Sequence, residues 1–167
     1  FRYDAAKRRR NSNYPPNGLL LLAQCLRSIS IEVEVISLNH EVLKKCNESD
    51  SIADFDHDKV WQACFDDKIS EFNPDIIGVT CMYTMTHNSF KNVCQYASKS
   101  NIPLAIGGVH TSNDVERILK DIQCVAFAFL READQSLPAF INVINKKTHI
   151  KELAQIVFYR DGDAIEI

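Results

Sequence analysis

The chain has 167 residues, a mass of 19.0 kDa and a formal net charge of -3. This weak negative charge gives no electrostatic reason to expect nucleic acid as a principal partner. No apolar run approaches the roughly 18–20 residues that a membrane-spanning helix needs, so no membrane partner is expected either. Hydrophobic residues make up 46% of the chain, which is typical of a globular domain with a full core.

The first half of the chain predicts two helices and one strand. Residues Phe1–Asn17 are polar and expected to be irregular. Apolar residues at helical spacing predict a helix over Gly18–Ser30. Alternating residues predict a strand over Ile31–Leu38, close to an edge of the sheet. The acidic stretch Asn39–His57 is expected to form a loop, and Asp58–Phe72 a second helix.

The second half alternates strands with helices and ends in a hairpin. The expected elements are a strand over Asp75–Cys81, a helix ending near Lys99, a strand over Pro103–Ile106, a short helix with Asn113 as its N-cap, a strand over Val125–Leu130, a helix over Ala133–Asn145, and a hairpin of Ile156–Arg160 and Ala164–Ile167. The first of these strands is apolar on both faces, which predicts a central position. The order indicates an α/β fold with a doubly wound, flavodoxin-like or Rossmann-like parallel sheet. We expect the usual first strand of such a sheet to lie just upstream of Phe1 or to be missing.

Two of the expected strands stop at small polar residues. Asp75–Thr80 runs into Cys81-Met82-Tyr83-Thr84, and Ile102–Gly108 runs into Val109-His110-Thr111. About twenty helix-patterned residues separate the two runs, which is the spacing of a parallel strand–helix–strand unit. Ligands of open parallel sheets bind where the strands end. The sequence therefore predicts a ligand site at this edge.

Taken without any family, the candidate side chains leave structural interpretations open. His110 is more often an ordinary histidine at a strand end than a ligand contact. A double glycine also serves close packing of the protein against itself. His57, among acidic neighbours, is expected to hold a cation weakly at best. No glycine-rich dinucleotide motif and no phosphate-binding P-loop is present, so neither site is expected.

The six cysteines are widely spaced and form neither a CxxC pair nor a CxxxCxxC cluster. Zinc, redox and iron–sulfur sites need thiolates at such short spacing. We expect no metal ligand among them and interpret them as reduced thiols in a cytosolic core. With no signal-like stretch at Phe1, the chain is expected to be part of a longer cytoplasmic protein.

Five strings occur in the order and at the spacing of one known family. They are YPPNGLLLLAQCLR, EVEVISLNHEV, FNPDIIGVTCMYT, NIPLAIGGVHTS and VAFAFLREADQSL. In these strings the chain resembles the cobalamin-binding domain of radical S-adenosylmethionine enzymes. The resemblance implies that residues 1–150 form the cobalamin-binding domain. Residues 151–167 would be a connector toward a radical S-adenosylmethionine barrel, the partner in the same polypeptide.

The resemblance also implies a set of cofactor contacts. A loop before the first helix would lie beside the corrin ring, and the strand-end residues would face its amides and nucleotide tail. The double glycine would let the backbone approach the tail. The turn Arg131-Glu132-Ala133-Asp134 stands where the family usually has a glycine–glutamate–glycine–glutamate sequence. Both glycines of that sequence are replaced here. The implied residues are Pro16, Asn17, Gly18, Thr80, Met82, Tyr83, Thr84, Gly107, Gly108, His110, Thr111, Arg131 and Glu132.

The implied function is to position the corrin for methyl transfer or related radical chemistry. The Asp-x-His-x-x-Gly ligand motif of methionine-synthase-like domains is absent, which implies cobalt without a protein histidine below it. Without CxxxCxxC the chain alone is not expected to catalyse, because the iron–sulfur cluster and S-adenosylmethionine belong to the barrel. Two alternatives stay open. One is a cofactor-free scaffold or interaction module, and the other is a flavodoxin- or receiver-like domain.

Overall fold

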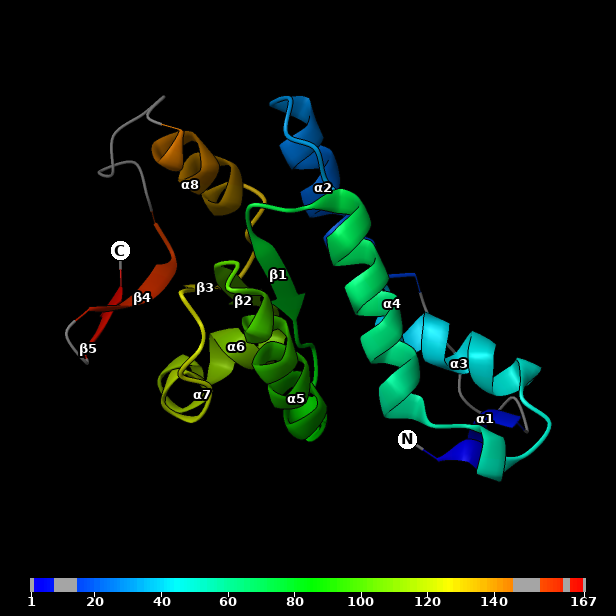
Figure 1. Cartoon of the computed structure of the whole chain (residues 1–167). Helices are drawn as coiled ribbons and strands as arrows, with labels where there is room; N and C mark the ends of the chain where they lie inside the picture. Colours follow the sequence, from blue (N-terminus) through cyan, green and yellow to red (C-terminus); the bar gives the residue numbers. More distant parts are fainter. Residues whose placement is uncertain (1, 8–14, 146–153, 161–162, 167) are drawn as a thin grey trace. The chain divides into compact units, whose positions relative to one another are not determined.

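The computed structural model describes residues 2–7, 15–145, 154–160 and 163–166 (Figure 1). The chain divides into two compact units. The first consists of Phe1–Ala23 and Val33–Asn73, and the second of Gln24–Glu32 and Pro74–Ile167. The first unit is helical in its described part, whereas the second contains the sheet.

The first unit packs short helices against one long one. Its elements are α1 (Tyr3–Lys7), the first half of α2 (Asn17–Ser28), α3 (Leu38–Glu48), the 3-10 turn η1 (Ile52–Asp54) and α4 (His57–Phe72). Helix α3 packs on both α1 and α4. Its buried side chains are Val42 and Cys46, four positions apart on one face, and α4 contributes Trp61 and Phe65. The core of this unit is therefore a helix–helix contact.

Three predictions for the N-terminal part of the chain are wrong. Residues 31–37 form no strand, although their apolar and polar residues alternate. Alternation alone does not make a strand, because a strand also needs a neighbour to complete its hydrogen-bond ladder. The expected Asn39–His57 loop contains α3, whose buried face offers only Val42 and Cys46 as a hydrophobic signal. Helix α1 likewise lies within the segment expected to be irregular.

The second unit contains a mixed five-stranded sheet. Its strands are β1 (Ile77–Thr80), β2 (Leu104–Gly107), β3 (Phe127–Phe129), β4 (Ile156–Arg160) and β5 (Asp163–Glu166), and they are ordered in the sheet as in the chain. The pairs β1–β2 and β2–β3 are parallel, whereas β3–β4 and β4–β5 are antiparallel. In this register Ile106 pairs with Val79 on one side and Ala128 on the other.

Helices cover both faces of this sheet. They are η2 (Thr84–Thr86), α5 (His87–Ala97), η3 (Ser98–Ser100), α6 (Val109–Asn113), α7 (Val115–Asp121) and α8 (Ser136–Ile144). Phe140 of α8 packs with Ala105, Phe129 and Ile156 in one buried cluster. Neighbouring residues of a strand point to opposite faces, so Leu104 and Ile106, each 1% exposed, face the other side. Helix α5 packs against β1 there.

The α/β class, the parallel β1–β2–β3 order and the terminal hairpin are confirmed. Three details differ from the prediction. β1 lies at an edge of the described sheet, and its Gly78 and Thr80 are exposed. The cap residue before α7 is Asp114, because Asn113 already ends α6. The apolar spacing of the helix predicted over Ala133–Asn145 predicts an inward Ile144, but this side chain is 47% exposed at the end of α8.

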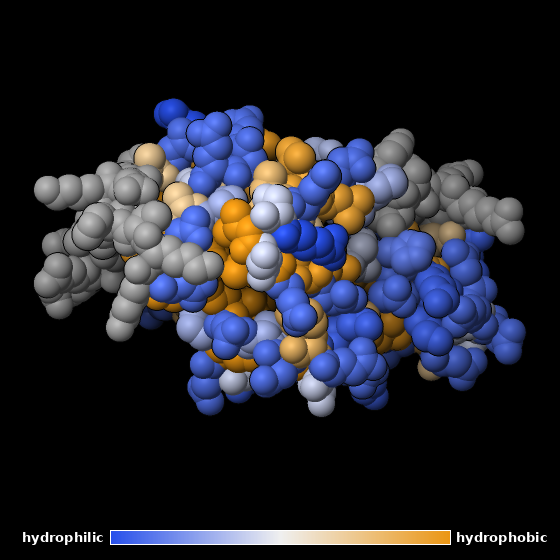
Figure 2. Space-filling view, turned by 90° about the horizontal axis from the view of Figure 1, so that it is seen from above, coloured by the Kyte–Doolittle hydropathy of each residue, from blue (hydrophilic) through white to orange (hydrophobic). Residues whose placement is uncertain are grey.

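Hydrophobic residues also reach the surface on the side of the molecule where α8 lies in Figure 1. Seen from that side, apolar residues interrupt the polar surface (Figure 2). Among the described residues, no helix combines the length and hydrophobicity needed to cross a membrane.

All six cysteines are free thiols, as expected. Burial raises the pKa of the Cys94 thiol to about 12, and the nearby Cys124 and Cys81 raise it in the same direction.

Candidate functional site

The loops that follow β1 and β2 lie side by side at the carboxyl edge of the sheet. Thr80 and Gly107, the last residues of the two strands, are register partners. Beyond them the Cys81 amide donates to the Gly107 carbonyl at 3.0 Å, and the His110 amide donates to the Cys81 carbonyl at 3.1 Å. The Thr111 hydroxyl closes the turn by donating to Gly107 O at 3.1 Å. The structure therefore brings the two predicted clusters together.

At Gly108 the backbones of these two loops approach each other closely. Its φ of +99° is a conformation that favours glycine. A Cβ at this position would lie 2.5 Å from the Cys81 carbonyl oxygen and 2.7 Å from Thr80 Oγ1. The missing side chain is therefore required by the β1 loop of the protein itself. That differs from the expected reason, which was room for a buried cofactor tail, and the contact with a cofactor stays a prediction.

Gly107 faces the neighbouring strand. A Cβ there would meet the Phe129 backbone oxygen at 3.6 Å, an ordinary van der Waals contact. The fold therefore does not require a glycine at position 107 for steric reasons. The contact of Gly107 with a cofactor also stays a prediction.

The loop after β3 joins the same edge. The Arg131 amide donates to Ser112 Oγ at 2.6 Å, and the Leu130 amide donates to the Gln155 carbonyl at 2.9 Å. Arg131 has a φ of +58°, in the left-handed region that favours glycine. Arg131 and Glu132 are both exposed. The turn therefore has a glycine-type conformation although arginine occupies the position.

Large apolar side chains are exposed at this edge. Met82 is 52% exposed, Tyr83 66%, Met85 89% and Val109 50%. The hydroxyl-bearing residues Thr80 and Thr84 are exposed beside them. The chain has only two methionines, and both are in this group. Met85 and Val109 were not among the predicted contacts, although Met85 follows directly on the predicted Met82–Thr84 run. Grouped apolar exposure of this kind marks binding surfaces.

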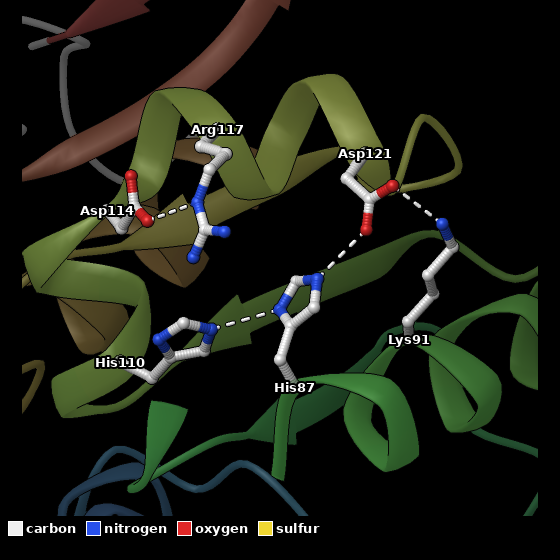
Figure 3. Close-up of polar contacts among 6 residues, drawn as sticks. All are labelled: His87, Lys91, His110, Asp114, Arg117 and Asp121. Atoms are coloured by element: carbon white, nitrogen blue, oxygen red, sulfur yellow. Dashed lines mark hydrogen bonds and ion pairs between the residues drawn. The ribbon is translucent and has the colours of Figure 1, made fainter. Parts of the chain in front are cut away.

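A series of hydrogen bonds leads from this edge through buried His110 to the exposed carboxylate of Asp121. Thr84 Oγ1 lies 3.2 Å from His110 Nδ1, and His110 Nε2 lies 3.0 Å from His87 Nδ1. His87 Nε2 lies 2.8 Å from Asp121 Oδ2, and Lys91 donates to the other carboxylate oxygen at 2.6 Å (Figure 3). His110 is 1% exposed. We name this set, Thr84, His110, His87, Asp121 and Lys91, the histidine relay.

Three members of the relay were missed by sequence reasoning. His87 and Lys91 belong to α5, and Asp121 ends α7, so 34 positions separate His87 from Asp121. Only the tertiary contact between α5 and α7 brings them together. The spacing of His87 and Lys91, four positions apart on one helix face, was the one available signal.

The surroundings of His110 disfavour its charged form. Burial lowers the pKa of His110, the facing His87 and Arg117 lower it further, and Asp114 opposes them. Asp114 and Arg117 are themselves ion-paired. Hydrogen bonds from Lys91 and His87 hold the pKa of Asp121 below its ordinary value. At neutral pH the relay therefore consists of neutral His110 with an ionised carboxylate at its far end.

The lowered pKa of His110 predicts acid sensitivity of the fold. Below the ordinary value of 6.5 the unfolded chain takes up a proton at this position that the folded chain resists. The contribution of His110 to the free energy of unfolding is thus complete above about pH 6.5 and is lost as the pH falls through its lower folded pKa. Urea unfolding at about pH 7.5 and about pH 5.5 measures it. His110→Gln should weaken the acid-side loss relative to the exposed control His40→Gln. Equal losses in the two variants would contradict the assignment.

The remaining predicted contacts belong to the first unit. Helix α2 starts at Asn17, and Gly18 has open space where a Cβ would be. Pro16 lines a cavity of about 390 Å³. The other lining residues are Pro15, Leu20, Val35, Ser37 and His40. The Pro16–Gly18 segment thus borders a hollow of its own unit, and its contact with the corrin ring stays a prediction.

The acidic group around His57 is explained by the start of a helix. Oxygen or nitrogen atoms of Asp56, His57 and Asp58 lie within 4.8 Å of one another. Asp56 is the N-cap of α4 and accepts hydrogen bonds from the amides of Asp58 and Lys59. Asp58 in turn accepts from the Trp61 ring at 2.9 Å. These carboxylates serve the helix, and no cation is needed to account for them.

Comparison with solved structures identifies the same fold in larger proteins. The chain superimposes on TsrM of Kitasatospora setae, a radical S-adenosylmethionine methyltransferase determined with its tryptophan substrate and an S-adenosylmethionine analogue. The TM-score is 0.72 at 15% identity, over 93% of this chain and 27% of TsrM. A second TsrM structure, with cobalamin and a 4Fe-4S cluster bound, gives the same score over 92% of this chain and 28% of that protein.

A further match is OxsB, a cobalamin-dependent S-adenosylmethionine radical enzyme determined with aqua-cobalamin and S-adenosylmethionine. Its TM-score is 0.62 at 14% identity, over 89% of this chain and 19% of OxsB. The chain therefore spans little more than a quarter of the first of these proteins. At such identities the likeness establishes the fold alone.

A search of curated proteins gave no match. The family model described as the B12 binding domain, in contrast, matches residues 4–141, which is most of the chain. That span includes β1, β2, β3 and the loops that follow them at the carboxyl edge. The chain belongs to the B12-binding domain family.

Proposed function

We propose that this domain binds cobalamin at the carboxyl edge of β1, β2 and β3, as the cofactor-holding part of a radical S-adenosylmethionine enzyme. The observation that carries the proposal is the exposed group Met82, Tyr83, Met85 and Val109, at the edge where parallel sheets bind their ligands. The family match supports the choice of ligand. The likeness to TsrM and OxsB supports the kind of parent enzyme.

The residues at this edge fit the chemistry of cobalamin. The corrin ring offers a broad apolar face, and its rim carries amide side chains. Methionine and tyrosine cover such a face well, because the thioether is adaptable and the aromatic ring is large and rigid. The exposed Thr80 and Thr84 supply hydroxyls that hydrogen-bond amides. Arg131 and Glu132 add charged groups on the third loop.

The relay supports a cobalt atom without a histidine ligand from this edge. Both ring nitrogens of His110 are engaged, Nδ1 by Thr84 and Nε2 by His87. His110 is also 1% exposed, so its ring does not reach the surface. We therefore assign His110 to support Thr84 and the β1 loop. Thr111, equally buried, holds the Gly107 turn.

The parent enzyme and its partner domain form the second part of the proposal. When bound, cobalamin supplies the group-transfer chemistry, such as methyl transfer, and this chain binds and orients it. The hairpin β4–β5 is fixed to the sheet by antiparallel pairing of Val157 with Ala128. We assign it as the connector to a radical S-adenosylmethionine barrel in the same polypeptide, which would hold the iron–sulfur cluster and S-adenosylmethionine.

Gel filtration of the chain after mixing with hydroxocobalamin tests the proposal. We expect about one corrinoid to co-elute with each chain, followed by its visible absorbance. Flavin mononucleotide, offered in parallel, should elute separately from the protein. Retention of the flavin in place of the corrinoid would favour the flavodoxin-like alternative. Retention of neither would favour a cofactor-free scaffold.

A further inference from the structure

The hydrogen-bond roles along the histidine relay follow from its two ends. An ionised carboxylate only accepts hydrogen bonds, so His87 Nε2 must donate to Asp121 at their 2.8 Å contact. In neutral His87 the other nitrogen, Nδ1, then accepts, and its partner His110 Nε2 donates. His110 Nδ1 is left as an acceptor, which makes the Thr84 hydroxyl a donor. Asp121 thus fixes the direction of every bond as far as Thr84.

One added proton reverses the direction of the hydrogen bond between His110 and Thr84. If the proton enters on His87, its Nδ1 donates to His110 Nε2, and His110 must carry its hydrogen on Nδ1. If the proton enters on His110, both nitrogens of that ring carry hydrogens. In either case His110 Nδ1 donates and Thr84 Oγ1 accepts. The outcome is therefore independent of which histidine holds the charge.

We propose that His87 and Asp121 act as positioning residues that set the hydrogen-bonding direction of Thr84 at the carboxyl edge, and that protonation of the His87–His110 pair reverses it. With the pair neutral, the hydroxyl proton of Thr84 points inward and its oxygen is presented outward as an acceptor. With the pair protonated, the hydroxyl proton is free to be donated outward. Toward an amide side chain of a corrin, Thr84 would then accept a hydrogen bond from the amide nitrogen in the neutral state. In the protonated state it would donate one to the amide oxygen.

The charged groups around the pair come from two elements. Lys91 of α5 and Asp121 of α7 flank His87, and Asp114 and Arg117, at the start of α7, face His110 (Figure 3). The Lys91–Asp121 ion pair keeps the carboxylate ionised at the far end. The buried position of His110 places the reversal on the acid side of the ordinary histidine range. We therefore expect the reversal as the pH falls below the ordinary histidine value of 6.5.

Nitrogen-15 spectra of the histidine rings in the 167-residue chain test the reversal directly. They distinguish a ring nitrogen that carries a hydrogen from one that does not. We expect His110 Nδ1 to be unprotonated and Nε2 protonated at about pH 8, and Nδ1 to gain a hydrogen by about pH 5. A hydrogen on Nδ1 at both values, or at neither, would overturn the proposal.

The variant Asp121→Asn tests whether the Asp121 carboxylate fixes the direction of the hydrogen bonds, as distinct from simply packing between the helices. Asp121 lies at an exposed position, so the variant is expected to fold. An amide can donate or accept, and the direction is then no longer fixed. We expect both tautomers of His110 at about pH 8. Asp114→Asn is the matched control, because Asp114 faces His110 without belonging to the relay, and it should keep the single tautomer. A single tautomer in Asp121→Asn would overturn the anchoring role.

The effect of the reversal on a bound corrin rests on the proposed function. The test of the reversal itself does not. The ring-nitrogen spectra need no cofactor, so a relay that reverses in a chain that fails to bind hydroxocobalamin leaves the relay standing and the cobalamin site refuted. Hydroxocobalamin binding with a His110 tautomer that never changes would refute the relay and support the cobalamin site. The two failures are therefore distinguishable.

Discussion

Gly108→Ala is expected to lower the free energy of unfolding by about 2–5 kcal/mol. Two costs add at this position. A φ of +99° is unfavourable for a residue with a Cβ, and that Cβ would lie 2.5 Å from the Cys81 carbonyl oxygen. The contacted atom is backbone, so relief requires the β1 loop to move. Urea unfolding measures the change.

Gly78→Ala is the matched control for this effect. Gly78 lies in β1, where an added Cβ meets no atom within 4 Å. Alanine also restricts the unfolded chain more than glycine does, so we expect this variant to be as stable as the parent or up to about 1 kcal/mol more stable. Equal destabilisation by the two substitutions would contradict the close approach of the strand-end loops.

Met82→Asp is expected to weaken hydroxocobalamin binding about tenfold or more. In the proposed complex the Met82 side chain is covered by the apolar corrin face, and a carboxylate there would lose its water without gaining a partner. Such a penalty exceeds the roughly 1.4 kcal/mol that corresponds to a factor of about ten. Since Met82 is 52% exposed in the chain, the substitution should leave the unfolding transition nearly unchanged. Absorbance titration gives the two dissociation constants.

Ile52→Asp controls for the added charge. Ile52 is an apolar side chain in η1 of the first unit and is 66% exposed. It receives the same carboxylate outside the proposed contacts, so its affinity for hydroxocobalamin should match that of the parent. A similar loss in both variants would mean that net charge, and not the Met82 contact, governs binding.

The sheet of the second unit was predictable because its signals are local. The strands β1, β2 and β3 are short apolar runs that end at polar residues, and the helices between them show clear apolar spacing. The hairpin was marked by Asp161-Gly162 between two apolar runs. Elements whose formation depends on a distant partner were not predictable. The stretch 31–37 alternates yet forms no strand, and α3 is held by only two buried side chains.

The candidate site was predictable to the same extent. Its place at the carboxyl edge followed from the ends of β1 and β2, and the structure brings those loops into contact. The structural role of Gly108 could not be predicted, because the Cys81 carbonyl that excludes a Cβ lies 27 positions earlier in the chain. The relay was hidden for the same reason, since His87 and Asp121 meet only through the tertiary contact between α5 and α7.

Amide NMR spectra of the chain, recorded during titration with hydroxocobalamin, test the proposed site most directly. If cobalamin binds where β1 and β2 end, the amide signals of residues 81–86 and 108–112 should shift, while those of Asp75, Ile76, Asn101 and Ile102 at the opposite ends of the same strands should stay in place. Shifts confined to the opposite ends, or no shifts at saturating corrinoid, would contradict a cobalamin site at the carboxyl edge.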